Sequence, residues 1–366
     1  MRQGVFALET NRLEIDKLLE IAVREDASDL HLTTGVPPMM RVAGRLVPVD
    51  GASPISFEEA ESLTSSIMPE EARARFREKG EVDFSYGIHG VGRFRVNIYR
   101  QRGAAAAAIR VIPWRIPNID ELGLPPVVKD LCQMTRGFIL VTGPTGSGKS
   151  TTLAAMIDFI NSQRSCHIVT LEDPIEYLHR HGKSIVNQRE IGSDSQSFAA
   201  GLRAALREDP DVIMVGEMRD LETISIAITA AETGHLVFAT LHTGDSVQTI
   251  DRIIDVFPPY QQQQVRIQLA GTLVAIIAQQ LVPRADGGGR VAAVEVMVAT
   301  PAIRSLIREG KTHQIRSMIQ TGAKFGMQTM DSALRALQER GIISGEEALA
   351  RALDREEFRR LARLPG

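Results

Sequence analysis

Two hydrophobic patterns divide the chain into a short first part and a longer second part. In the first part, short segments with alternating apolar and polar residues predict strands, and segments with apolar residues every three or four positions predict helices. The expected helices lie at residues 13–23, 54–68 and 69–79, and the expected strands at 29–32, 39–49 and 82–103. Asn11 and Glu14 have the three-residue spacing of a capping box at the start of the first helix. These elements predict a small α+β domain.

Five consecutive alanines at residues 104–108 follow these elements. Alanine favours helix, but five residues are too few to nucleate one between strand-like segments, so we expect a strand. Next comes a stretch with prolines at 113, 117, 125 and 126, which favours an extended, turn-rich connection. The sequence therefore predicts a domain boundary near residue 115, with a first domain and linker at residues 1–115 and a second domain at residues 116–366.

In the second domain, short and almost wholly apolar segments alternate with helical ones. The expected strands lie at 138–142, 167–171, 212–215 and 235–241, and the expected helices begin near 149, 197 and 221. Such an alternation predicts a parallel sheet with helices on both faces, which places this domain in the α/β class. A hairpin around residues 285–290 follows, and the last part of the chain is expected to be helical, with Ser344 and Glu347 at capping-box spacing.

Composition and charge narrow the class of protein. The chain has 366 residues, 43% of them hydrophobic and 24% charged, with a formal net charge of −3. These values exclude a disordered chain, and they argue against a protein that coats nucleic acid, so no direct nucleic-acid partner is expected. No apolar segment approaches the roughly 18 residues of a membrane-spanning helix. We therefore expect a cytoplasmic protein without a transmembrane segment.

A glycine-rich segment, GPTGSGKS, carries the clearest chemical signal. It matches the phosphate-binding P-loop pattern, follows an apolar strand and precedes an expected helix, as that motif requires. Its backbone N–H groups would surround the phosphates of ATP, Lys149 would reach the β- and γ-phosphates, and Ser150 would bind Mg²⁺. The expected nucleotide-binding residues are Gly143, Pro144, Thr145, Gly146, Ser147, Gly148, Lys149, Ser150 and Thr151.

The strand at 212–215 ends unusually for a P-loop enzyme. The position where most members of this class carry an aspartate for the Mg²⁺ shell is Gly216, and Glu217 follows it. Another carboxylate must then serve the metal, and Glu172, at the end of a neighbouring expected strand, is the candidate. The alternative is that Glu172 and Asp173 only form the turn before Pro174. Glu217 is the expected catalytic residue that orients and activates the attacking water.

His242 lies just beyond the end of the strand at 235–241, where a structural histidine would be the default interpretation. Because Glu172, Glu217 and the P-loop are expected at the same edge, we predict that His242 senses the γ-phosphate.

Arginines gather in the first domain, within a stretch that has no acidic residue between Asp83 and Asp120. Three interpretations are open: a solvated face, a nucleic-acid surface, or arginine fingers that reach the ATP of a neighbouring subunit. The candidate catalytic arginines are Arg93, Arg95, Arg100 and Arg110.

Together these motifs resemble one family, the secretion ATPase superfamily of type II secretion and type IV pili. The matching segments are GPTGSGKST, LEDPIEY, VIMVGEMRD and GHLVFATLHTGD, in this order. Within that superfamily, ASDLHL and AIRSLIREGK resemble segments of the pilus retraction ATPases, with Ser305 in place of an asparagine. The sequence shows neither the longer N-terminal region nor the four-cysteine insertion that are typical of assembly ATPases, so we expect a retraction motor and not a pilus-extension or type II secretion motor.

The resemblance implies a RecA-like P-loop ATPase domain behind a PAS-like N-terminal domain, in a homohexameric ring. It implies ATP and Mg²⁺ as cofactors, with Ser150 and Glu172 at the metal, and trans-acting arginines from the N-terminal domain. Hydrolysis would turn an inner-membrane platform protein at the pilus base and drive pilus retraction, disassembly and twitching motility.

Two alternatives keep the same chemistry: a PilU-like accessory retraction ATPase, which is also a candidate partner, and an assembly ATPase of pili or type II secretion. A third alternative is a scaffold that binds ATP and hydrolyses it too slowly to do work.

Overall fold

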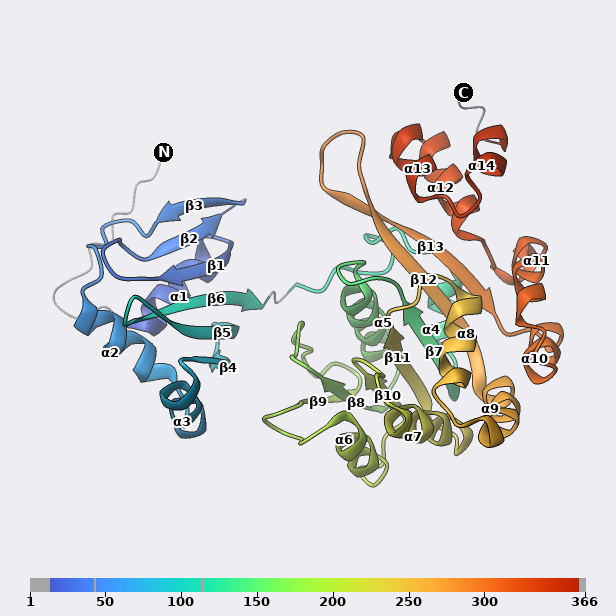
Figure 1. Ribbon diagram of the computed structural model, residues 1–366, viewed down its shortest axis with the longest axis horizontal. Helices are drawn as coiled ribbons and strands as arrows, with labels where there is room; N and C mark the ends of the chain where they lie inside the picture. Colours follow the sequence, from blue (N-terminus) through green and yellow to red (C-terminus); the bar gives the residue numbers. More distant parts are fainter. Residues whose placement is uncertain (1–13, 43, 113–114, 362–366) are drawn as a thin grey trace. The chain divides into compact units, whose positions relative to one another are not determined.

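The computed structural model describes residues 14–42, 44–112 and 115–361. The chain forms two compact units, the first ending at Arg115 and the second beginning at Ile116 (Figure 1). Asn11 of the expected capping box and Pro113 of the expected linker lie outside the described residues.

The first unit is a six-stranded antiparallel sheet with helices, in the order β3-β2-β1-β6-β5-β4. Apolar residues of all three helices share one core with inward-facing strand residues such as Leu30, Phe94 and Ile98. Its elements are α1 (Ile15–Arg24), β1 (Ala27–Leu32), β2 (Met39–Val42), β3 (Arg45–Pro48), α2 (Phe57–Ile67), α3 (Glu70–Lys79), β4 (Glu81–Ile88), β5 (Gly92–Gln101) and β6 (Ala104–Ile112).

The alanine segment is a strand, as expected. It begins β6, which pairs with β1 on one side and β5 on the other. Four of its five alanines are buried, and Ala105 and Ala107 belong to the core that the helices share with the sheet. Sheet pairing therefore overrides the helix propensity of alanine here.

The second unit is built on a seven-stranded sheet in the order β13-β12-β7-β11-β10-β8-β9. Neighbouring strands from β9 to β12 are parallel, and β13 pairs antiparallel to β12 at the edge. The strands are β7 (Gly137–Thr142), β8 (His167–Glu172), β9 (Ile185–Glu190), β10 (Val212–Val215), β11 (Leu236–Leu241), β12 (Leu273–Pro283) and β13 (Arg290–Val298).

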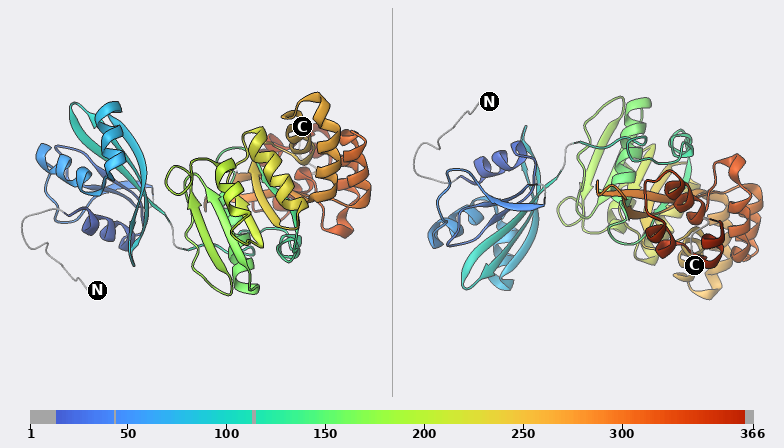
Figure 2. Two further views of the ribbon diagram at one scale, coloured as in Figure 1. Left: turned by 90° about the horizontal axis from the view of Figure 1, so that it is seen from below. Right: turned by 90° about the horizontal axis from the view of Figure 1, so that it is seen from above.

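Helices cover both faces of this sheet, which confirms the expected α/β class (Figure 2). Phe138 and Leu140 of β7 belong to one apolar cluster with α7 to α10, whereas Ile139 and Val141 belong to another with α4 and α5. The helices are α4 (Val127–Cys132), α5 (Lys149–Gln163), α6 (Phe198–Ala205), α7 (Leu221–Glu232), α8 (Ser246–Asp255), α9 (Pro259–Thr272) and α10 (Pro301–Arg308).

The C-terminal part is helical, as expected, and α12 to α14 pack on residues of β12 and β13. The Ser344 side chain accepts a hydrogen bond from the Glu347 N–H and so caps α13. The remaining elements are the 3₁₀ turns at Thr312–Gln314 and Ala323–Phe325, α11 (Ile315–Gln320), α12 (Met330–Glu339), α13 (Gly345–Arg351) and α14 (Arg355–Leu361).

Candidate active site

The P-loop connects β7 to α5, with Gly148 as the N-cap of the helix. Gly143 must be glycine, because a Cβ there would lie 2.2 Å from the Gln279 carbonyl oxygen and φ is +145°. Gly148 also has a left-handed backbone, with φ of +87°. The loop therefore turns tightly under the first N–H groups of α5, the part of a helix that attracts anions.

Polar groups around the loop fit a polyphosphate. The Lys149 ammonium donates hydrogen bonds to the Gly143 and Pro144 carbonyl oxygens at 2.9 and 3.2 Å, which holds its charge over the loop. Within the described part of the chain, the buried hydroxyls of Thr142 and Ser147 have no hydrogen-bond partner. Buried hydroxyls usually have a hydrogen-bond partner, so the hydroxyls of Thr142 and Ser147 are available to form hydrogen bonds with a ligand.

Glu217 lies at the centre of a polar cluster beyond the end of β10. Its Oε1 accepts hydrogen bonds from Arg219 Nε at 2.6 Å and from His242 Nε2 at 2.9 Å. The other ring nitrogen of His242 lies 3.5 Å from the Thr145 hydroxyl of the P-loop. The structure thus brings together three predicted site residues, Thr145, Glu217 and His242, which come from three separate segments.

The charge state of Glu217 follows from these contacts. Partial burial raises its pKa, but the hydrogen bond from Arg219 and the nearby charges of His242 and Arg219 outweigh burial, so the pKa lies below its ordinary value. Glu217 is therefore ionised at neutral pH, which is the form that accepts a hydrogen bond from a water molecule. Arg219 was not predicted, although it lies only two residues after Glu217.

Glu172 ends β8, the strand that pairs in parallel with β10. Its carboxylate is buried and accepts hydrogen bonds from the Thr170 hydroxyl at 2.6 Å and the Gln188 amide at 2.9 Å. Gly216 directly follows β10, and its N–H donates to the Leu171 carbonyl oxygen at 2.7 Å. A Cβ at Gly216 would lie 3.1 Å from that oxygen and 3.4 Å from Glu172 Cα. Close packing against β8 therefore favours glycine at this position.

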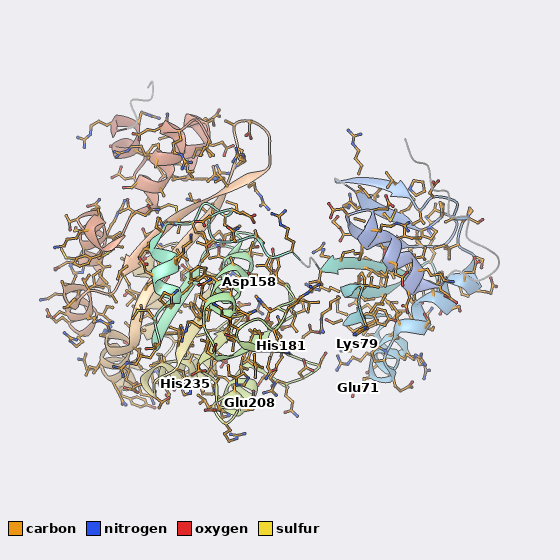
Figure 3. All side chains as sticks on the ribbon, turned by 180° about the vertical axis from the view of Figure 1, so that it is seen from behind. Glu71, Lys79, Asp158, His181, Glu208 and His235 are labelled. Carbon is orange, nitrogen blue, oxygen red and sulfur yellow. The ribbon has the colours of Figure 1, made fainter. Side chains whose placement is uncertain are left out.

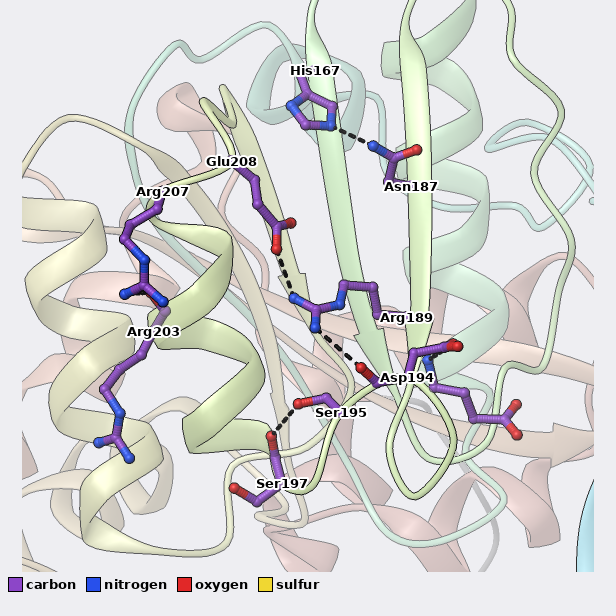
Figure 4. A network of polar contacts seen from close by, with 10 residues as sticks. His167, Asn187, Arg189, Asp194, Ser195, Ser197, Arg203, Arg207 and Glu208 are labelled. Atoms are coloured by element: carbon purple, nitrogen blue, oxygen red, sulfur yellow. Dashed lines mark hydrogen bonds and ion pairs between the residues drawn. The ribbon is translucent and has the colours of Figure 1, made fainter.

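A polar network fixes β9, the strand that supplies Gln188 (Figure 4). Arg189 donates to the Glu208 carboxylate at 2.7 Å and to the Asp194 carbonyl oxygen at 3.1 Å. The Asp194 carboxylate in turn accepts from the Glu190 N–H at 2.8 Å. These bonds tie the edge strand to the loop after it and to the residues that follow α6, so that Gln188 is held against Glu172.

His235 lies at the opposite end of β11 from the candidate site. His235, which Figure 3 labels, precedes β11, whereas His242 follows the same strand. Its Nδ1 lies 3.0 Å from the Ala230 carbonyl oxygen and 3.3 Å from the Thr233 hydroxyl, so it serves the turn after α7. Of the two histidines that flank β11, only His242 contacts the P-loop and Glu217.

The four candidate arginines lie on β5 and β6 of the first unit. Arg110 forms an ion pair with Asp29 at 3.0 Å, and Arg100 pairs with Glu61 at 3.3 Å and lies over the Phe76 ring. Arg95 is exposed and directly opposite Arg110 in the strand register, and Arg93 is half-buried. Phe94, Val96 and Ile98 face the core, so Arg93 and Arg95 share the other face.

Gln279 on β12 is a functional candidate that sequence reasoning missed. This buried side chain donates from its amide nitrogen to the Ser147 carbonyl oxygen at 2.6 Å, and its amide oxygen accepts from the Thr152 hydroxyl at 2.8 Å. One amide thus holds both the P-loop and the first turns of α5. The available signal was a pair of glutamines within an otherwise apolar strand, AIIAQQLV.

No three His, Cys, Asp or Glu side chains gather into a metal-binding group within the described ranges. Among the same residues, no helix has the length and apolar character required to cross a membrane.

Comparison with known proteins places the chain in a family. The model of the family described as "Type II/IV secretion system protein" matches residues 9–350. The type IV pilus retraction ATPase PilT of Pseudomonas aeruginosa is 50% identical over 94% of this chain and 100% of its own length. The type IV pilus ATPase PilU of the same organism is 44% identical over 96% of this chain and 92% of its own length.

A solved structure supports the same placement. The crystal structure of the pilus retraction motor PilT with bound ADP superposes with a TM-score of 0.88 at 52% identity, over 95% of this chain and all of that one. The fold is accordingly a RecA-like P-loop ATPase domain with a smaller PAS-like N-terminal domain. The chain belongs to the type II/IV secretion system protein family, and within it to the nucleotide-binding ATPases of the PilT type.

Proposed function

We propose that this protein is a motor ATPase that drives retraction of type IV pili. The observation that carries the proposal is the cluster of Thr145, Glu217 and His242 at a complete P-loop, because it joins the phosphate-binding loop to an ionised carboxylate and a histidine. The likeness to PilT, over the whole length of that protein, supports retraction as the task.

In this proposal the chain's own residues have distinct roles. The P-loop binds the phosphates of ATP, and Lys149 neutralises the charge that develops during transfer of the γ-phosphoryl group. Glu217 accepts a hydrogen bond from the attacking water and orients it, while His242 detects the γ-phosphate. Arg219 keeps Glu217 ionised and fixes its direction.

Mg²⁺ fits the donors that are present. It prefers few protein ligands together with water and phosphate oxygens, so the absence of a three-residue cluster among the described residues is compatible with it. Ser150 and Glu172 are the residues that would hold the ion, Glu172 from its position at the end of β8. When bound, Mg²⁺ would stabilise negative charge on the phosphate oxygens.

The working assembly in this proposal is a homohexameric ring in the cytoplasm, next to an inner-membrane platform protein at the pilus base. Arginines of the N-terminal domain, from the set Arg93, Arg95, Arg100 and Arg110, complete the ATP site of a neighbouring subunit. The two domains rotate against each other around the linker as ATP is hydrolysed. The platform protein then turns, and pilin subunits return to the membrane.

Deletion of the gene in its own host tests the direction of work. Loss of a retraction motor should leave abundant surface pili on cells that no longer move by twitching, and the wild-type gene in trans should restore movement. A Glu217→Gln copy should bind ATP but fail to restore movement, because general-base catalysis contributes about 10² to 10⁴ in rate.

A cell without pili would indicate an assembly motor. Unchanged motility would indicate an accessory, PilU-like role, and full rescue by Glu217→Gln would indicate a scaffold.

A further inference from the structure

Glu295 on β13 is a buried carboxylate outside the cluster described above. Its side chain is 3% exposed. Oε1 accepts hydrogen bonds from the Ser246 N–H at 2.9 Å and the Ser246 hydroxyl at 2.7 Å, and the Met330 N–H lies near enough to favour the charged form of the carboxylate. Burial of a carboxylate costs folding free energy unless its oxygens accept hydrogen bonds. The groups that donate to Glu295 therefore indicate its role.

The two backbone groups that face Glu295 belong to the first residues of two helices. Ser246 begins α8 and Met330 begins α12. The first N–H groups of a helix have no partner within the helix and carry positive partial charge, so a carboxylate stabilises both ends at once. Burial raises the pKa of Glu295 above its usual value, and the hydrogen bonds from Ser246 and Met330 act in the opposite direction.

The segment before α12 is fastened to β13 on both sides of Glu295. The Gln328 side chain donates to the Val294 carbonyl oxygen at 2.7 Å. The Gln328 backbone exchanges hydrogen bonds with Val296 at 2.9 and 3.2 Å. The Glu295 side chain therefore reaches Met330 from a strand to which this segment is already bound, which makes the junction with α12 rigid.

On the other side, Glu295 holds the loop that carries His242. Only residues 242–245 separate the end of β11 from Ser246. Asp245 caps α8 through the Gln248 N–H at 2.8 Å, and the Thr243 and Thr249 hydroxyls lie 2.6 Å apart. The short loop is thus bound to the first turn of α8, and a displacement of Ser246 displaces His242.

We propose that Glu295 is a positioning residue that sets the His242 loop at the nucleotide site and couples it to the C-terminal helices α12 to α14. The inference rests on the proposed function, because it gives His242 a role during ATP hydrolysis. Glu295 itself acts only through the N-terminus of α8. A displacement of the His242 loop would in turn be transmitted to the C-terminal helices through the same carboxylate.

Three variants separate positioning from general stability. Glu295→Ala removes every acceptor, and Glu295→Gln keeps one oxygen at nearly the same place. Asp331→Asn is the matched control: Asp331 also accepts backbone N–H bonds, from Leu353 at 2.8 Å and Asp354 at 3.3 Å, but its contacts stay within the C-terminal helical part and do not involve α8.

Hydrogen–deuterium exchange of the full-length variants gives a readout that does not require activity. Glu295→Ala should increase exchange at residues 242–249 and 328–333, and Glu295→Gln should increase it less. Asp331→Asn should leave residues 242–249 unchanged. Unchanged exchange at 242–249 in both Glu295 variants would overturn the proposal.

Steady-state ATP hydrolysis then tests the route through His242. Glu295→Gln should lower kcat about tenfold, because small displacements of a positioned group are costly, while KM for ATP changes little. In a His242→Ala background the same substitution should lower kcat no further. An equal fall in both backgrounds, or equal losses in kcat and in affinity for ADP, would overturn the proposal. A wild-type chain that hydrolyses no ATP would contradict the proposed function instead, and the exchange data would still decide on Glu295.

Discussion

At the scale of single residues, the amide of Gln279 controls the shape of the P-loop. Gln279→Glu replaces its donor to the Ser147 carbonyl oxygen with a second carboxylate oxygen, and it places negative charge beneath the phosphate site. Affinity for ADP should therefore fall by about tenfold or more, since an unsatisfied or repelled buried group costs about 1 to 3 kcal/mol. Titration with a fluorescent ADP analogue measures this change.

The neighbouring position supplies the control for that experiment. Gln280→Glu makes the same substitution on the same strand, but successive strand residues point to opposite faces and Gln280 is only half-buried. ADP should bind this variant as it binds the wild type. Equal weakening in both variants would show that charge on β12, and not the amide contact of Gln279, affects the nucleotide.

Site residues that belong to one contiguous motif could be predicted from the sequence, whereas contacts between distant positions could not. The P-loop, Glu217 and His242 were predictable because each belongs to a contiguous motif of known chemistry. Gln279 lies 132 positions after Ser147 in the sequence, and only the pairing of β12 with β7 brings them together. Arg219 was missed for another reason: an exposed arginine in a turn has no pattern that separates it from a solvated one.

At the scale of elements, Arg304 joins α10 to the preceding helix. Its guanidinium donates hydrogen bonds to the Ala299, Ala270 and Gly271 carbonyl oxygens, the last two in the final turn of α9. Carbonyls at a helix end lack partners within the helix, so Arg304 satisfies groups that would otherwise need water.

Removal of this link should loosen the second unit. Arg304→Ala should lower the free energy of unfolding by about 1 to 3 kcal/mol, because several hydrogen bonds to one charged group are lost. Arg308→Ala, on an exposed position of the same helix, should change it by less than about 0.5 kcal/mol. Urea unfolding of both variants measures the difference. Similar urea midpoints for the two variants would contradict the prediction that Arg304 stabilises the unit by linking α10 to α9.

Elements with strong periodicity were predicted, and those with a mixed composition were not. The strands β7, β10 and β11 are buried at every position and form continuous apolar segments in the sequence. In contrast, β9 was missed because IVNQRE is largely polar, which is the composition that an edge strand permits. Helices α8 and α9 were missed too, although Asp245 provides a recognisable cap for α8.

At the scale of the whole molecule, the proposed ring makes a prediction about mixed assemblies. Glu217→Gln subunits retain the arginines, and Arg93→Ala/Arg95→Ala subunits retain Glu217. If the arginines act on a neighbour's ATP, each pure ring should be inactive, and rings mixed from both should regain part of the wild-type rate of ATP hydrolysis. Steady-state phosphate release from co-assembled rings measures the recovery.

Arg77→Ala, an exposed position on α3, is the control for loss of charge in the same unit, and it should hydrolyse ATP normally. Mixed rings as inactive as the pure ones would contradict arginines acting across subunits, provided that size-exclusion chromatography shows co-assembly. Activity in pure Arg93→Ala/Arg95→Ala rings would exclude this pair and leave Arg100 and Arg110 as candidates.

The close approach of Gly216 to the neighbouring strand also bears on how such motors can be found and how they can change. A Cβ at this position would lie 3.1 Å from the Leu171 carbonyl oxygen and 3.4 Å from Glu172 Cα, so an aspartate here requires the neighbouring strand to shift by a few tenths of an ångström. A motif search that demands an acid before Glu217 will therefore overlook this chain, which has Gly216 there.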